Sequence, residues 1–310
     1  MGRNLGEIAR LLNPDAQLTD AGTLGGGISY HTQRATLQVP GELPIDVIIR
    51  EAGSDKLDLH PRHLSEEFAL LEHLASLTSF AIKVPNPLLL LHNENDLPDC
   101  VVFDFTPGEP AVRHPTPKSL APALAETLAA LHQVTSLPAS LSFLVDRGED
   151  TQRWPLLRPT TLDDSLREGL IRDAMASFRC TGTNRSSLLH GDFWPGNIIL
   201  NNRKIACIVD WEDALFGEPL NDLAIARLDL LWCYGHEVMQ SFTDHYLSIT
   251  RVDAHDLPYW DLFAALRPCG YLDEWCEGWA AMGRSDVTLT TLTQQHYWFV
   301  DEALARNSFR

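Results

Sequence analysis

The sequence has no long apolar runs, few cysteines and no repeats, and each shortage excludes a class of protein. No apolar stretch is long enough to span a bilayer, and the first residues lack the apolar segment of a signal peptide. We therefore expect a cytoplasmic protein without a membrane partner. The six cysteines are scattered without paired metal-ligand spacing, which indicates reduced thiols rather than a disulfide framework. The sequence shows no internal repeat and no low-complexity segment, so neither a solenoid nor a disordered chain is expected.

Basic residues are also scarce, at 24 Lys+Arg against 42 Asp+Glu, and the formal net charge is -18. Such a charge argues against nucleic acid as a main partner, because the phosphate backbone would be repelled. The 120 residues from Gly191 onward carry 18 acidic and 8 basic side chains, so more than half of the excess lies there. Two explanations stay open, namely solubility of the surface and an acidic substrate cleft. The length of 310 residues suffices for one large domain or for two lobes.

One stretch, residues 188–223, concentrates polar side chains around two short apolar runs. The runs 198–200 and 205–209 are rich in β-formers and flank a polar turn, which predicts a hairpin. Asp192 and Asn197 precede the first run, and Asp210 follows the second. Because a hairpin brings the start of its first strand close to the end of its second, we expect these three side chains to converge. Two carboxylates and a carboxamide make a hard oxygen site that suits Mg²⁺.

Three motifs in this region occur in a fixed order. They read His-Gly-Asp-x-x-x-x-Asn from 190 to 197, Ile-Val-Asp-Trp-Glu from 208 to 212, and Gly-x-Pro-x-x-Asp-Leu-Ala from 217 to 224. Their wording and order resemble the aminoglycoside phosphotransferase family, the small-molecule kinase branch of the protein-kinase-like fold. The resemblance implies an α+β, two-lobed fold. A small antiparallel sheet lobe with a helix would cover 1–106, and a larger, mainly helical lobe with the catalytic hairpin and the substrate cleft would cover 107–310.

The same resemblance implies transfer of the γ-phosphoryl group of ATP, or of GTP, to a hydroxyl of a small molecule. Asp192 would accept or orient the proton of the attacking hydroxyl. Asn197 and Asp210 would hold Mg²⁺ on the phosphates, and His190 and Asp222 would brace the catalytic loop. Two alternatives stay open. One is a metabolite kinase of the choline, homoserine or thiosugar type, and the other is a non-catalytic nucleotide-binding module.

Nucleotide binding would use the first lobe, according to the resemblance. Arg50, at the end of a predicted strand over 45–51, stands where protein kinases carry a lysine, and it would hold the α- and β-phosphates. Glu67, with Glu66 as the alternative, would pair with Arg50 from the helix predicted over 61–77. The phosphate loop would comprise Gly25, Gly26, Gly27 and Ser29, and the Asp104 carbonyl and the Thr106 amide would meet the adenine edge.

For the acceptor, the acidic second half predicts a polar alcohol with at least one positive amine, such as an aminoglycoside or an amino alcohol. The chain would act as a monomer or a homodimer. The candidate acceptor-binding residues are Asp229, Trp232, Asp273, Glu274 and Trp275.

The remaining periodicity predicts further elements. Strands over 33–39, 45–51, 88–91 and 100–103 belong to an antiparallel sheet of about five strands. His132 is expected to be a packed structural histidine, and 141–159 is expected to be irregular. Helices are predicted over 5–12, 61–77, 119–134, 163–178, 220–234, 237–249, 259–266, 272–282 and 292–305.

Overall fold

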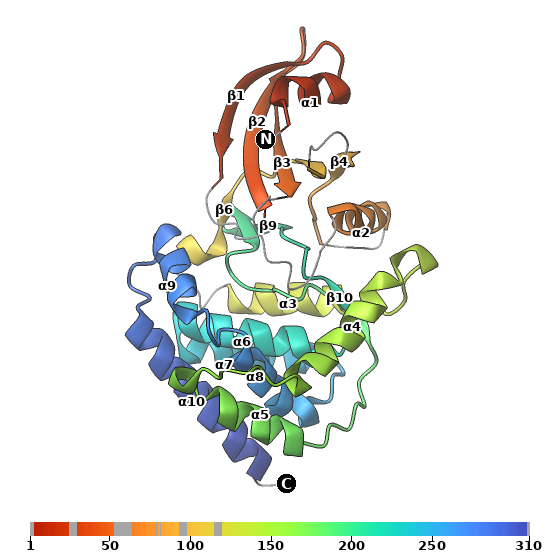
Figure 1. Cartoon of the computed structure of the whole chain (residues 1–310). Helices are drawn as coiled ribbons and strands as arrows, with labels where there is room; N and C mark the ends of the chain where they lie inside the picture. Colours follow the sequence, from red (N-terminus) through yellow and green to blue (C-terminus); the bar gives the residue numbers. More distant parts are fainter. Residues whose placement is uncertain are drawn as a thin grey trace. The chain divides into compact units, whose positions relative to one another are not determined.

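The chain separates into two compact units (Figure 1). Unit 1 comprises Met1–Gly108 and Ala206–Glu212, and unit 2 comprises Glu109–Ile205 and Asp213–Arg310. Residues 206–212 belong to unit 1 because the Ile208 N–H donates to the Lys83 carbonyl at 3.0 Å and because Asp210 contacts Arg50. The computed structural model describes residues 3–24, 30–52, 64–77, 80, 82–92, 98–114 and 120–308.

Unit 1 is built on a five-stranded antiparallel sheet with the strand order β1-β2-β3-β5-β4. This is the sheet that the sequence predicts, with the addition of β1, which the apolar pattern misses because every residue of β1 is exposed. The elements of this unit are α1 (Leu5–Leu12), β1 (Gln17–Thr23), β2 (Tyr30–Gln38), β3 (Ile45–Ala52), α2 (Leu64–Ser76), β4 (Pro87–Leu91) and β5 (Cys100–Asp104).

The apolar core of unit 1 lies between α1 and the sheet. Helix α1 begins at an Asn4 side chain that accepts the N–H groups of Gly6 and Glu7, as expected of an N-cap residue. Its buried residues Ile8 and Ala9 then pack into the same cluster as the inward-facing side chains of β2, β3 and β5. The alternation of side chains along β3 fixes its register, because a slip of one residue would expose the buried face.

Unit 2 is mainly helical and is organised around α6 (Leu220–Tyr234), which is buried along almost its whole length. A helix that is apolar on most sides needs neighbours on most sides, and α7, α8 and α10 pack against it. The other elements are β6 (Glu109–Pro110), α3 (Ala121–Leu131), α4 (Phe143–Arg153), α5 (Glu168–Ser177), β7 (Ser187–Leu189), β8 (Ile198–Asn201), β9 (Lys204–Ile208), β10 (Leu215–Gly217), α7 (His236–Ile249), α8 (Leu257–Leu266), α9 (Leu272–Ala281) and α10 (Leu289–Ser308).

The predicted hairpin is present as β8 and β9, which form a three-stranded sheet with β6. Its turn residues Asn202 and Arg203 have φ angles of 49° and 63°. Two consecutive residues with positive φ are typical of the tight turn whose twist matches that of a hairpin. Strand β7, which precedes the hairpin, pairs with β10, which follows it, and the loop that carries Asp192 therefore lies between two paired strands.

The prediction of irregular structure over 141–159 is wrong, because α4 occupies most of that segment and a short 3₁₀ turn, Trp154–Leu156, follows it. The segment is rich in charged residues and shows no apolar periodicity, since only Leu144 and Gly148 of the helix are buried. Gly148 allows α4 to approach β10 closely, and a Cβ atom there would lie 2.1 Å from the Phe216 carbonyl oxygen.

The remaining predicted helices are present, and most differ from the prediction only at their ends. The helix predicted over 163–178 instead consists of a 3₁₀ turn, Asp164–Leu166, followed by α5. Arg167 between them has a φ of 58°, which breaks the helix. Within the described part of the chain, no helix is both long and apolar enough to cross a membrane.

Candidate functional site

The loop that carries Asp192 is fixed by the first turn of α6. The Asp222 carboxylate accepts the backbone N–H of His190 at 2.7 Å and that of Gly191 at 2.8 Å. Gly191 has a φ of 78°, and a Cβ atom there would lie 2.0 Å from the Asp213 carbonyl oxygen. The loop therefore requires glycine at this position, both for its backbone conformation and for its close packing.

Asp222 is itself fully buried and is supported from α3 and α7. His132, which caps α3, lies 3.4 Å from Asp222 through Nε2 and 2.6 Å from the Tyr246 hydroxyl through Nδ1. His132 is buried, as expected of a packed structural histidine. These buried polar contacts connect α3, α6 and α7 to the Asp192 loop. Because buried polar groups that are hydrogen-bonded form a rigid network, the loop is held in one conformation.

Both oxygens of the Asp192 carboxylate have a partner on the protein. Asn197 Nδ2 donates to Oδ2 at 2.9 Å, and Arg267 Nη2 donates to Oδ1 at 2.6 Å. The Asp192 side chain nevertheless remains 24% exposed, so a ligand can reach it. Since Asn197 uses its amide nitrogen for Asp192, its amide oxygen is the atom that can coordinate a cation.

Arg267, at the end of α8, was not among the residues predicted from the sequence. Arg267 lies 75 residues beyond Asp192 and belongs to no recognisable motif, so the sequence does not indicate this contact. The packing of α8 brings the two side chains together. Burial alone would lower the pKa of Arg267, but the carboxylates of Asp192, Asp229 and Asp213 outweigh it and raise the pKa. The guanidinium is therefore a permanent positive charge beside Asp192.

Asp229 belongs to this group and is buried in α6, with 6% of its surface exposed. Burial raises the pKa of its carboxyl to about 8; Asp192 also raises it, and Arg267 opposes the shift. Asp229 is thus buried and interacts with Arg267, rather than being exposed on the surface.

In unit 1, Arg50 is surrounded by three carboxylates. Its Nη1 donates to both oxygens of Glu67, at 2.8 and 2.9 Å, and its Nη2 contacts Asp210 at 2.9 Å and Glu212 at 3.0 Å. The guanidinium also lies over the Tyr30 ring, 4.5 Å from its centroid. The partner from α2 is therefore Glu67, as the resemblance implies, and not Glu66.

The Arg50 cluster carries more negative than positive charge. Burial raises the pKa of Glu67 to about 7; Arg50 opposes this shift, and Asp210 and Glu212 add to it. For Arg50, burial alone would lower the pKa, but the three carboxylates reverse the effect and raise it. One guanidinium facing three carboxylates leaves an excess of negative charge, which a divalent cation would balance.

Glu212 was not predicted from the sequence, although its spacing could have revealed it. In the segment Asp210-Trp211-Glu212 the two carboxylates are two positions apart, and both contact Arg50 Nη2. Trp211 between them is fully buried, and its backbone N–H donates to Glu67 at 3.2 Å. Asp210 has a φ of 68°, an uncommon conformation for a residue other than glycine and one that recurs at functional sites.

The donor atoms predicted to hold Mg²⁺ divide between the two units. Asn197, with Asp192, lies in unit 2, whereas Asp210 lies in unit 1. Their convergence stays a prediction. Among the described residues, no group of three or more His, Cys, Asp or Glu side chains is arranged as a metal site. The carboxylate of Asp210 and the amide of Asn197 are nevertheless the hard oxygen donors that fit Mg²⁺ when phosphates supply further ligands.

The other predicted residues have different environments. Gly25, Gly26, Gly27 and Ser29 lie outside the described residues. Asp104 ends β5, where its side chain accepts the Asn86 N–H at 2.7 Å; the adenine contacts of the Asp104 carbonyl and the Thr106 amide stay a prediction. Of the acceptor candidates, Trp232 is buried and donates to the Leu292 carbonyl, Trp275 is half-buried, and Asp273 and Glu274 are exposed in the first turn of α9.

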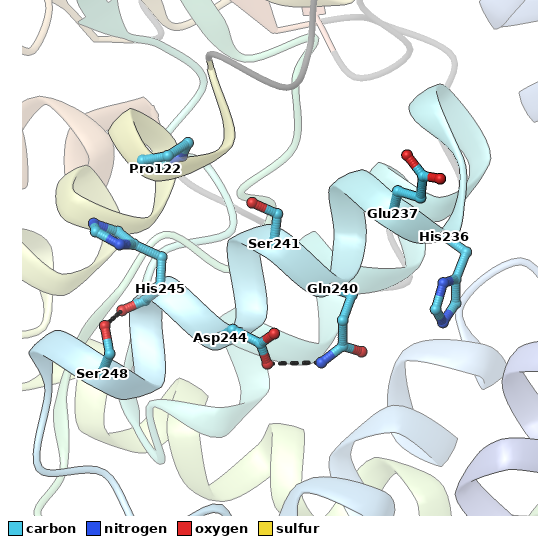
Figure 2. Close-up of a pocket in the computed structure, with 8 residues that line it drawn as sticks. All are labelled: Pro122, His236, Glu237, Gln240, Ser241, Asp244, His245 and Ser248. Carbon is cyan, nitrogen blue, oxygen red and sulfur yellow. Dashed lines mark hydrogen bonds between the residues drawn. The ribbon is translucent and has the colours of Figure 1, made fainter.

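A hollow on the surface of unit 2 lies along α7 (Figure 2). Figure 2 shows that the α7 residues that line it include His236, Gln240, Asp244 and His245, while Pro122 comes from α3. Gln240 donates to Asp244 at 2.7 Å, so these polar groups partly satisfy one another. Among the predicted site residues that the structure describes, none lines this hollow.

Comparison with solved structures supports the kinase-like fold. An aminoglycoside phosphotransferase-like protein from Ralstonia eutropha is 13% identical, with a TM-score of 0.59 and coverage of 98% of both chains. The GDP complex of a mutant aminoglycoside 2'-phosphotransferase is 20% identical, with a TM-score of 0.57 and coverage of 97% of this chain and 96% of that one. Amicoumacin kinase is 15% identical, with a TM-score of 0.61 and coverage of 96% and 92%.

Comparison of sequences gives the family. A curated relative, acyl-CoA dehydrogenase family member 11 of Rattus norvegicus, is 30% identical in an alignment 100 residues long, which covers 27% of this chain and 13% of that protein. The chain therefore spans only a small part of that relative's length. The model of the phosphotransferase enzyme family matches residues 54–263, well over half of the chain. This chain is thus a member of the phosphotransferase enzyme family, with the α+β kinase-like fold of its structural neighbours.

Proposed function

We propose that this protein is a kinase that transfers the γ-phosphoryl group of ATP, or of GTP, to a hydroxyl group of a small molecule. The observation that carries the proposal is the preorganised carboxylate of Asp192. Its loop is bound through two backbone N–H groups to Asp222, and its own oxygens are oriented by Asn197 and Arg267. A rigid carboxylate that a ligand can still reach suits the proton transfer that this reaction requires.

In this mechanism Asp192 orients the acceptor hydroxyl and receives its proton as the new P–O bond forms. The bond between the γ-phosphorus and the β-γ bridging oxygen breaks, and ADP or GDP leaves. Phosphoryl transfer asks mainly for positioning and charge neutralisation. Arg50, held by Glu67, would bind the α- and β-phosphates. Asn197 and Asp210 would hold Mg²⁺, which neutralises charge on the phosphates when it is bound.

The non-catalytic alternative has one observation in its favour. Arg50 Nη2 already contacts Asp210 and Glu212, so a nucleotide must compete with two carboxylates for this guanidinium. The full set of Asp192, Asn197 and Asp210 argues for catalysis, because a binding module has no need of a proton acceptor. The acceptor also stays open, since a cationic amine, a metabolite alcohol and an aminoglycoside all carry hydroxyl groups.

The proposal is tested by incubating the protein with ATP and Mg²⁺ and a panel of alcohols, and by detecting phosphorylated products by mass spectrometry. We expect at least one acceptor to gain a phosphoryl group in a Mg²⁺-dependent reaction. Binding of ATP without transfer to any acceptor and without slow hydrolysis to ADP would instead identify a nucleotide-binding module. In calorimetric titration with Mg·ATP, Asp210→Ala should weaken Mg²⁺-dependent nucleotide binding, because a hard ligand and a negative charge are lost. Unchanged affinity and unchanged metal dependence would show that Asp210 does not hold the metal.

A further inference from the structure

Arg267 has hydrogen-bonding capacity that its protein contacts do not use. A guanidinium carries five N–H donors, and in the described part of the chain only Nη2 has a hydrogen-bond acceptor, Asp192 at 2.6 Å. The side chain is 20% exposed, and none of its nitrogens is among the buried polar atoms without a partner. The remaining N–H groups are therefore open to a ligand.

Aromatic side chains hold this guanidinium in position. It lies over the ring of Trp275, 5.7 Å from the centroid, and Trp275 makes an edge contact with Trp232 at 6.0 Å. Asp229 and Asp213 contribute attractive charge. Arg267 is thus held in place by α6 and α9 as well as by Asp192, which reduces the entropy lost when it binds a ligand.

An acceptor bound for this reaction would lie next to Arg267, because both would contact the Asp192 carboxylate. An acceptor hydroxyl that transfers its proton to Asp192 must lie within about 3 Å of one of its oxygens. Arg267 Nη2 lies 2.6 Å from the same carboxylate. The reacting oxygen and the guanidinium are then neighbours, so that charged groups beside the reacting oxygen interact directly with Arg267.

We infer that Arg267 binds an oxyanion beside the reacting hydroxyl, an inference that rests on the proposed function. Guanidinium groups suit this task because their planar fork matches carboxylate and phosphate oxygens. The oxyanion has two possible sources. It is either a carboxylate or phosphate substituent of the acceptor or the phosphoryl group in transfer, and both present the same chemistry to Arg267. A positively charged substituent at this place would be repelled.

The first experiment measures phosphorylation of matched acceptors by the wild type, Arg267→Gln and Arg267→Lys. The acceptors are three-, four- and six-carbon polyols that end in a carboxylate, a hydroxymethyl or an aminomethyl group. If the oxyanion belongs to the acceptor, the wild type should prefer the carboxylate series at least about 10-fold in kcat/KM, and Arg267→Gln should abolish that preference through KM. If it is the transferring phosphoryl group, Arg267→Gln should lower kcat for every acceptor by about 10²-fold with KM unchanged.

Arg267→Lys should restore part of either effect, because it keeps the charge but loses the fork. The matched control is Arg153→Gln, which removes an exposed arginine of α4 that pairs with Glu149. Equal kinetics of Arg267→Gln and the control for every acceptor would overturn the inference. If the wild type phosphorylates acceptors and the Arg267 variants do so equally well, the proposed function is supported and the role of Arg267 is rejected.

The second experiment does not depend on turnover, so it separates this inference from the proposed function. Inorganic phosphate is titrated into ¹⁵N-labelled protein, and the indole N–H signal of Trp275, assigned with Trp275→Phe, is followed by NMR. The signal should shift with phosphate in the wild type and in Arg153→Gln but not in Arg267→Gln. An unchanged Trp275 signal in the wild type would overturn the oxyanion site. A shift without any phosphoryl transfer would support the site while the proposed function fails.

Discussion

At the scale of single residues, two arginines of the candidate site lie in different charge environments. Arg50 faces Glu67, Asp210 and Glu212, whereas Arg267 has one direct carboxylate contact. Burying a charge is costly unless it is paired, so each guanidinium requires the carboxylates around it. Removing either arginine therefore leaves uncompensated negative charge at a defined place.

Substitution of Arg50 tests whether it is the counter-charge of Glu67, Asp210 and Glu212. Arg50→Ala should lower the free energy of unfolding by about 3–5 kcal/mol, because three carboxylates lose their counter-charge. Arg50→Lys should lose less stability and keep part of the nucleotide affinity, since the positive charge is retained. Denaturant titration gives the stability and calorimetric titration with Mg·ATP gives the affinity.

The matched control is Arg34→Ala, which removes a more exposed arginine of the same sheet that pairs with Asp46. An exposed pair of this kind contributes at most about 1 kcal/mol. Equal losses for Arg50→Ala and Arg34→Ala would show that the Arg50 cluster is not a coupled unit.

At the scale of elements, α4 depends on one glycine. Gly148→Ala places a Cβ atom 2.1 Å from the Phe216 carbonyl oxygen, so α4 or β10 must move. We expect a loss of about 1–3 kcal/mol in the free energy of unfolding, as for other overpacked sites. Gly278→Ala in α9 is the control. It meets nothing within 4 Å and should instead stabilise the protein by about 0.5–1 kcal/mol through helix propensity. Similar effects of the two substitutions in thermal or chemical unfolding would contradict the packing of α4 against β10.

The packing of α10 gives a pH-dependent prediction. Burial lowers the pKa of His296 from 6.5 to about 4, although its hydrogen bond to the Leu166 carbonyl opposes the shift. Because the unfolded state binds the proton more tightly, this histidine contributes stability that is present above pH 6.5 and is lost as the pH falls toward 4. The loss should reach about 3 kcal/mol, because each tenfold difference in proton affinity between the folded and unfolded states corresponds to about 1.4 kcal/mol.

His296→Gln cannot take up a proton, so its stability should change less than that of the wild type between pH 6.5 and 4. Chemical unfolding of both proteins at a series of pH values measures this difference. Parallel curves would show that His296 does not titrate with a lowered pKa.

At the scale of the whole molecule, the sequence predicts most of the fold because its signals are local. Alternating apolar residues reveal the sheet of unit 1, and the two apolar runs around a polar turn reveal the β8–β9 hairpin. The motif spacing also leads to Asp192, Asn197 and Asp222, whose contacts lie within unit 2. The sequence does not predict α4, which is rich in charged residues, or β1, whose residues are all exposed. Neither has the apolar pattern on which such predictions depend.

The candidate site was less predictable wherever a contact depends on tertiary packing. Arg267 reaches Asp192 from the end of α8, and its distance along the chain offers no signal. The acidic excess after Gly191 suggested an acceptor side rich in free carboxylates. Asp229, however, is buried, and Arg267 places positive charge beside Asp192. Net charge counted along the sequence therefore does not give the charge around the Asp192 carboxylate.

Replacement of Asp192 by Asn tests most directly whether Asp192 acts in hydroxyl-directed phosphoryl transfer. Asp192→Asn keeps the shape of the side chain and the contact with Asn197, while it removes the proton-accepting charge and the ion pair with Arg267. We predict that turnover with the best acceptor falls by about 10²–10⁴-fold, whereas calorimetric affinity for Mg·ATP stays close to that of the wild type. Turnover within a few-fold of the wild type would contradict the assignment of Asp192 as the catalytic base.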